Sequence, residues 1–176
     1  MSARAVRVVR GARLTALAAA LWGALLATPA AGQPLAPGRP MPDIGHDHVP
    51  NGTRVTYPAH PPTSGTHWPQ WADWGVHEAP VPEEMFVHNL EHGGVVILYR
   101  CPGACPDVVR ELEATFRALP PSKYGHVKVI VSPNDRIRTR FALLAWTRLD
   151  EFDAFDRDRV LRFVRAYQDR GPEDVP

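Results

Sequence analysis

The sequence predicts an α+β fold, a single small domain in which helices pack on one mixed or antiparallel sheet. The chain has 176 residues, which is the size of one domain. Its second half alternates short apolar, β-branched runs with segments whose apolar residues recur every three or four positions. Its first half is instead rich in Pro, His and Trp, and we expect that half to be mainly ordered loop.

The regular elements are predicted from these two periodicities. In chain order they are a strand at 95–100, a helix from Pro106 or Asp107 to the Pro120-Pro121 pair, a strand at 126–133, a strand at 141–149, and a helix from Asp156 or Asp158 to about Gln168. The C-terminal part is therefore expected to run β-α-β-β-α. Residues 53–57 form a further, short β-type run.

Residues 80–94, PVPEEMFVHNLEHGG, fit two structures. A short helix would start near Pro82 and end at Gly93. A strand would put Phe86, His88 and Leu90 on one face. The alternation favours a strand or hairpin.

The chain begins with a segment typical of export. Residues 1–32 combine four arginines, an apolar centre and a small-residue exit, as a signal peptide does; an uncleaved anchor is the alternative. Residues 33–47 read as a flexible or extended lead-in, and 48–176 as the single α+β domain. We expect an exported protein, periplasmic or secreted, which the N-terminal segment would anchor if it is not removed.

The charge excludes one class of partner. The whole chain is formally +1, and the four arginines of residues 1–32 contribute +4, so residues 33–176 carry −3. Nucleic-acid binding depends on clustered Lys and Arg, so no nucleic-acid partner is expected. A metal ion is the expected partner, with another exported or membrane protein as a second one.

Histidines point to the metal. Seven of the eight precede Cys101. His88 and His92 share a face whether the segment is a helix or a strand, and His67 lies in a rigid PPTSGTH loop. Three imidazoles are the usual protein ligands of an open zinc or copper site, with Glu91 as a fourth ligand or as the group that orients a ring.

Other features of the histidine pattern weigh less. H-x-x-E-H also matches the inverted zincin motif, but Gly93-Gly94 would end its helix at once, so metal binding is favoured over proteolysis. His46 and His48 form a His-x-His arm that we expect to be solvated.

Cys101 and Cys105 are the only cysteines, and in an exported chain we expect them to form a disulfide. Their place before a helix start leaves a redox-active pair open. The stretch YRCPGACPD also resembles the strand-then-CPxxCP segment of Sco-type copper chaperones, a local likeness. Trp68, Trp71 and Trp74 could stack a sugar, but packing of the loop against the sheet is favoured.

Several stretches together resemble one family. HVPNGTRVTYPAHPPTSGTHWP, FVHNLEHGGVVILYR and FALLAWTRLDEFDAFDRDRVLRFVRAYQDRGPE are similar to an uncharacterised family of bacterial exported proteins, domain of unknown function 3105. The matching positions include His48, His67, His88, Glu91 and His92. The resemblance supports export and these residues, and it implies no activity.

The favoured function is an extracytoplasmic copper- or zinc-binding domain. Three alternatives stay open: a metal-dependent enzyme at the same histidines, a thiol redox or copper-handling protein using the two cysteines, and a structural or interaction module without metal. No nucleophile, base and oxyanion donors can be assembled from the sequence, so catalytic residues are not assigned.

Overall fold

The computed structural model describes residues 36–176. The predicted signal or anchor segment, 1–32, lies outside them. A six-stranded mixed sheet has the order β1-β6-β5-β3-β4-β2. The strands are β1 (Arg39–Pro40), β2 (Gly75–Val76), β3 (Val95–Tyr99), β4 (Val129–Pro133), β5 (Phe141–Ala145) and β6 (Arg148–Phe152). The helices are α1 (Glu83–Glu91), α2 (Pro106–Phe116) and α3 (Arg157–Tyr167).

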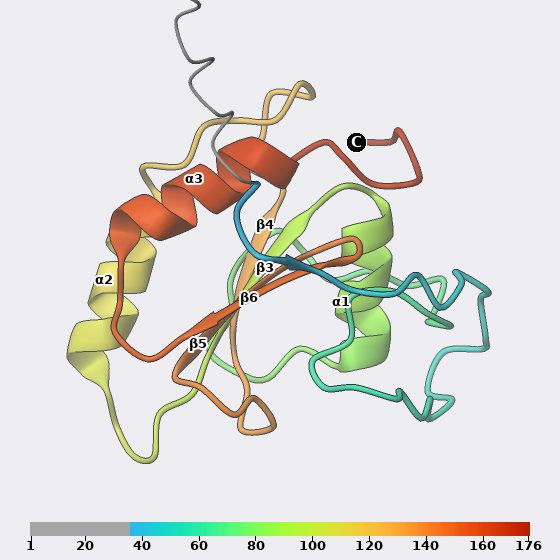
Figure 1. The fold of residues 1–176 in the computed structure, drawn as a ribbon, viewed down its shortest axis with the longest axis horizontal. Coiled ribbons are helices and arrows are strands. Elements are labelled where there is room, and N and C mark those ends of the chain that lie inside the picture. Colours follow the sequence, from blue (N-terminus) through green and yellow to red (C-terminus); the bar gives the residue numbers. More distant parts are fainter. Residues whose placement is uncertain (1–35) are drawn as a thin grey trace, which may run out of the picture. The chain divides into compact units, whose positions relative to one another are not determined.

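The sheet separates two layers of helix (Figure 1). α2 and α3 cover one face, and α1 with the N-terminal loops covers the other. Residues of β3 alternate between the two cores: Val95 and Ile97 face α2 and α3, whereas Val96 and Leu98 face α1. Burial of both faces explains why β3 is continuously apolar. The predicted α+β class is confirmed.

Three local predictions are wrong. Residues 83–91 are helix and not strand. The run 141–149 is a hairpin of β5 and β6, which turns at Trp146 and Thr147. Residues 53–57 form no strand, because the Val55 N–H donates to the Glu84 carboxylate at 3.1 Å instead of to a neighbouring strand.

The lead-in carries structure of its own. Arg39–Pro40 pair with β6, and Gly65 N–H donates to Gly45 O at 2.7 Å. Residues 36–47 thus lie against the sheet and the PPTSGTH loop. In the described residues, no helix is both long and apolar enough to cross a membrane.

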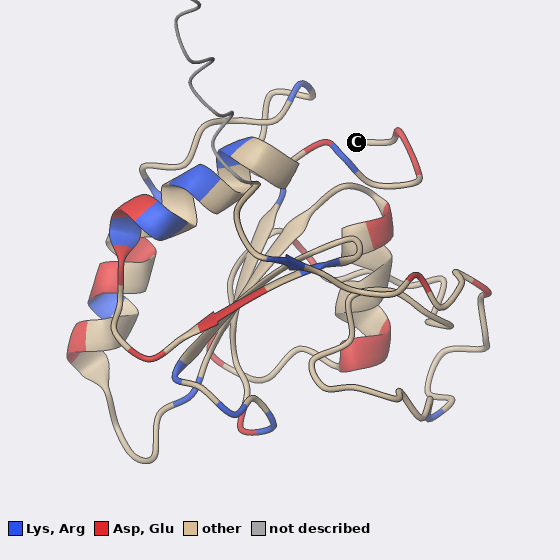
Figure 2. Cartoon of the chain, in the orientation of Figure 1, with Lys and Arg blue, Asp and Glu red and all other residues tan. Residues whose placement is uncertain are grey.

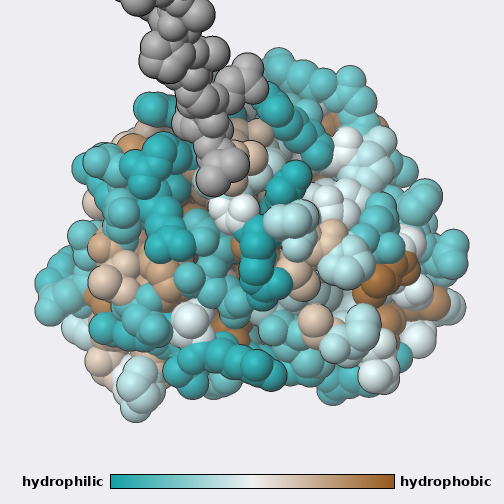
Figure 3. Space-filling view, in the orientation of Figure 1, coloured by the Kyte–Doolittle hydropathy of each residue, from teal (hydrophilic) through white to brown (hydrophobic). Residues whose placement is uncertain are grey.

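The surface of the described domain is mixed in character. Charged residues of both signs lie along α2 and α3 (Figure 2). Hydrophilic side chains cover most of the face seen in Figure 3, with hydrophobic ones in small patches.

Helix α3 begins at a side-chain cap. The Asp156 carboxylate accepts the N–H of Arg159 at 2.9 Å. We expect Asp156→Ala to lower the free energy of unfolding by about 1 kcal/mol, because one helix N–H loses its acceptor. Urea unfolding followed by circular dichroism measures this loss. Asp158→Ala, which removes a carboxylate from the first turn but no cap, is the control; an equal loss in both would contradict the capping role.

Candidate metal centre

Helix α1 supplies two groups of the centre. His88 and Glu91 are three residues apart and therefore neighbours on one face. The helix ends at Glu91 with His92 as its C-cap, and Gly93 follows with a positive φ of 76°. A side chain at Gly93 would meet the backbone of Gly171 at 2.8 Å, so glycine here lets the C-terminal chain pass close to the end of α1.

The PPTSGTH loop supplies His67, whose side chain is fully buried. Its Nδ1 lies 2.8 Å from the carbonyl oxygen of Gly65. Because a carbonyl can only accept, Nδ1 carries the hydrogen and donates it. In the neutral ring this leaves a lone pair on Nε2, which lies 3.0 Å from Oε2 of Glu91.

His88 has the same tautomer. Its Nδ1 lies 2.7 Å from the carbonyl oxygen of Trp68 and donates to it, so the lone pair is again on Nε2. Burial lowers the pKa of His88 below its usual value, so the ring is held neutral. Metal-binding histidines typically donate their second ring N–H to a carbonyl or carboxylate in this way.

The segment that directly follows the lead-in supplies His48. The two residues that flank His48 are hydrogen-bonded to the backbone of His67. Val49 N–H donates to His67 O at 2.9 Å, and His67 N–H donates to Asp47 O at 3.0 Å. His48 Nε2 lies 3.6 Å from Oε2 of Glu91, and His46 Nδ1 lies 3.1 Å from Oε1. Both rings are exposed to solvent, as predicted, and both also contact Glu91.

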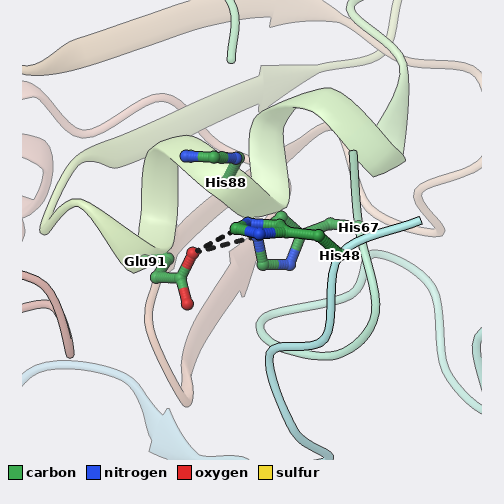
Figure 4. A group of neighbouring side chains, drawn as sticks. All are labelled: His48, His67, His88 and Glu91. Carbon is green, nitrogen blue, oxygen red and sulfur yellow. Dashed lines mark hydrogen bonds and ion pairs between the residues drawn. The ribbon is translucent and has the colours of Figure 1, made fainter. Parts of the chain in front are cut away.

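Four of these groups gather in one place (Figure 4). The ligand atoms of His48, His67, His88 and Glu91 all lie within 4.8 Å of one another. Only 1% of the Glu91 side chain is exposed, and its Oε1 has the His46 ring at 3.1 Å but no hydrogen bond of good geometry. Imidazole and carboxylate together suit zinc and copper, so this group could hold such an ion.

His92 has a different place from the other predicted ligands. Its Nε2 lies 2.8 Å from Nε2 of His88 and 3.3 Å from Oε2 of Glu173, and its Nδ1 is buried without a hydrogen-bond partner. The pKa of His92 is lowered to about 4, mainly because the ring is buried and secondly because His88 is close to it. The structure thus brings His67, His88 and Glu91 together with His48, and sets His92 beside them.

Sequence reasoning missed His48 and Glu173. His48 had a signal, because it is one of the positions that match the family pattern. Glu173 lies in a polar C-terminal segment, and nothing in the local sequence distinguishes it from its acidic neighbours.

Of the three tryptophans, Trp74 packs against the sheet as expected. Trp74 lies in the core between the sheet and α1, whereas Trp68 is held by a hydrogen bond from its Nε1 to Thr53 O at 2.7 Å. Trp71 is half exposed, with its ring centroid 5.4 Å from that of His88 and 5.1 Å from that of His92. Trp71 thus covers the histidine pair on the solvent side.

Asn89 fixes this tryptophan loop to α1. Its fully buried side chain accepts the N–H of Ala72 and donates to the carbonyl of Ala72, both at 2.8 Å. The loop also carries the Trp68 carbonyl that sets the tautomer of His88. The amide of Asn89 therefore helps to position His88, a candidate ligand, without touching it.

The cysteines lie apart from the centre. Cys101 and Cys105 form a disulfide, as predicted, just before α2. They pack against the core shared with α2 and α3, on the sheet face opposite to α1. The disulfide therefore contributes no sulfur ligand to the histidine group.

Comparisons with known proteins give one result. The family model described as "Protein of unknown function (DUF3105)" matches residues 48–176. The match includes every residue of the centre, from His48 to Glu173. Neither the curated proteins nor the solved structures contain a match to the chain.

Proposed function

The chain belongs to the family described as Protein of unknown function (DUF3105), and from that premise we propose that it is an extracytoplasmic metal-binding domain. It would hold one Cu²⁺ or Zn²⁺ ion with His48, His67, His88 and Glu91. His92, a ligand in the set expected from sequence, would serve as a neighbour of His88 instead.

One observation carries the proposal. Nε2 of His67 and Oε2 of Glu91 face each other at 3.0 Å, while Nδ1 of His67 already holds a hydrogen. Two lone pairs at this distance repel unless a positive charge lies between them. A proton would satisfy these two atoms alone. A metal ion would also use the lone pair of His88, the ring of His48 and Oε1 of Glu91, whose only neighbour among these groups is the exposed ring of His46 at 3.1 Å.

The ligand set favours particular ions. Three imidazole nitrogens and one carboxylate are typical of zinc and of Cu²⁺, whereas Mg²⁺ and Ca²⁺ prefer oxygen. The two cysteines are already joined, and residues 33–176 contain only Met41 and Met85. A site for Cu⁺, which favours sulfur, is therefore disfavoured.

Export is the second part of the proposal. The N-terminal segment has the composition of a signal peptide, and a disulfide persists in oxidising compartments. A metal-binding domain with a weakly acidic charge would then work outside the cytoplasm, free or anchored by its first residues.

Metal content tests the function. The full-length chain is exported without a tag, recovered and measured by mass spectrometry beside His67→Gln/His88→Gln and, as control, His126→Gln, whose histidine is exposed and outside the group. We expect about one copper or zinc ion per chain in the wild type and the control. The double variant should lose it while its circular dichroism is unchanged. Absence of metal from the wild type, even after challenge with excess copper and zinc, would end the proposal.

A further inference from the structure

The C-terminal tail, residues 169–176, is fastened to the end of α1 that carries the centre. Asp169 N–H donates to Gly93 O at 2.8 Å, and Glu173 N–H donates to Glu91 O at 3.0 Å. Figure 1 shows the chain crossing from α3 to the α1 side of the sheet before it ends. The tail thereby reaches a helix some eighty residues earlier in the sequence.

Lys128 links the same tail to the end of α1. Its side chain is buried, and its ammonium group donates to the carbonyl of His92 and, at 2.7 Å, to the carbonyl of Val175. The tail is therefore fixed on both sides of Glu173. The Glu173 side chain is 45% exposed, and its Oε2 lies 3.3 Å from Nε2 of His92.

The hydrogens of the histidine pair can be assigned from their partners. His88 donates from Nδ1 to Trp68 O, so its Nε2 can only accept. His92 has no partner at its buried Nδ1, so its hydrogen is best placed on Nε2, where His88 Nε2 lies 2.8 Å away. Without metal, His92 therefore donates to the lone pair that His88 needs for an ion.

We propose that Glu173 frees His88 for the metal ion. When Nε2 of His88 binds the ion, the N–H of His92 transfers its hydrogen bond from His88 to Oε2 of Glu173. No proton is gained or lost in this exchange. The inference rests on the proposed function, and it makes Glu173 a positioning residue of the centre.

The tail would also respond to the ion. If docking of Glu173 strengthens metal binding, the ion must strengthen docking of the tail by the same factor, because the two equilibria are linked. The tail of the loaded protein would then be held more firmly than that of the metal-free protein. Metal binding would therefore change how firmly the surface tail is held.

Metal affinity tests the exchange. Competition with a chromophoric chelator for Zn²⁺ and Cu²⁺ compares the wild-type chain with Glu173→Ala, Glu173→Gln and Glu113→Ala. We expect Glu173→Ala to bind about tenfold more weakly, because the N–H of His92 is left buried without an acceptor. Glu173→Gln should recover most of the affinity, since its amide oxygen accepts the same hydrogen bond. Glu113, 43% exposed on α2, is the matched control and should have no effect.

Amide hydrogen exchange gives a second measurement. Metal should slow exchange of the Asp169 and Glu173 amides in the wild type and in Glu173→Gln, and not in Glu173→Ala. If Glu173→Ala merely loosened the tail, its amides would exchange faster than those of the wild type by the same factor with and without metal.

Three outcomes would overturn the inference. Unchanged affinity in Glu173→Ala would show that His88 needs no such help. A Glu173→Gln as weak as the alanine variant would assign the effect to carboxylate charge or to direct ligation. A wild type that binds no metal would overturn both proposals, whereas the first two results leave the proposed function standing.

Discussion

Asn89→Ala is expected to lower the free energy of unfolding by about 3 kcal/mol, because two buried backbone groups lose their partners. The side chain of Asn89 is fully buried and bonds both the N–H and the carbonyl of Ala72. Alanine offers neither a donor nor an acceptor, and water has no access to replace them. Urea unfolding in the presence of a chelator measures the loss in the metal-free protein.

The same variant should weaken metal binding. The tryptophan loop would no longer be fixed to α1, so the Trp68 carbonyl would hold His88 less firmly. Asn51→Ala is the control, because the Asn51 amide bonds Gln70 at the surface, and it should change stability by less than about 0.5 kcal/mol. Similar losses in both variants would show that Asn89 has no special structural role.

Bound metal is expected to stabilise the fold by about 4 kcal/mol when free Zn²⁺ or Cu²⁺ is about a thousand times its dissociation constant. The gain arises because the folded chain presents the ligands together and the unfolded chain does not. Unfolding in metal-buffered solutions, at several free-ion concentrations, measures it. The eight histidines of the unfolded chain will bind some metal and reduce the gain.

Two comparisons isolate the centre as the source of that stability. Mg²⁺ at the same concentration should have no effect, since it prefers oxygen ligands. The variant His88→Gln/Glu91→Gln should gain no stability from Zn²⁺, and binding of the ion to its unfolded chain could only lower its stability. If this variant gains as much stability as the wild type, the ion acts at another place and the assigned ligands are wrong.

The sequence predicted the part of the centre that lies close together along the chain. His88 and His92 are four apart and share a face under either secondary structure, so their proximity did not depend on the choice between helix and strand. Glu91 did depend on it, since only a helix sets it beside His88. The helix was missed because eight of the nine residues of α1 are buried, including Glu83 and Glu84, and no apolar stripe marks one face.

The remaining parts depend on distant backbone contacts. His48 reaches Glu91 because its segment pairs with His67, and Glu173 reaches His92 because Lys128 holds the tail. Local patterns carry no information about such pairings. The β5–β6 turn was missed for a similar reason: it contains no Gly, Asn or Pro, and Thr147 takes a positive φ of 55° that β-branched residues rarely adopt.

The crossing of the tail to α1 has a consequence for timing. During synthesis or translocation, His48 to His92 emerge before all of the strands against which α1 packs, and Glu173 emerges only after the last of those strands, β6, and after α3. An emerging chain therefore presents its histidines long before it can arrange them. Ion capture at this centre would be a late step in folding, so a loaded domain would be one whose sheet and third helix have already formed.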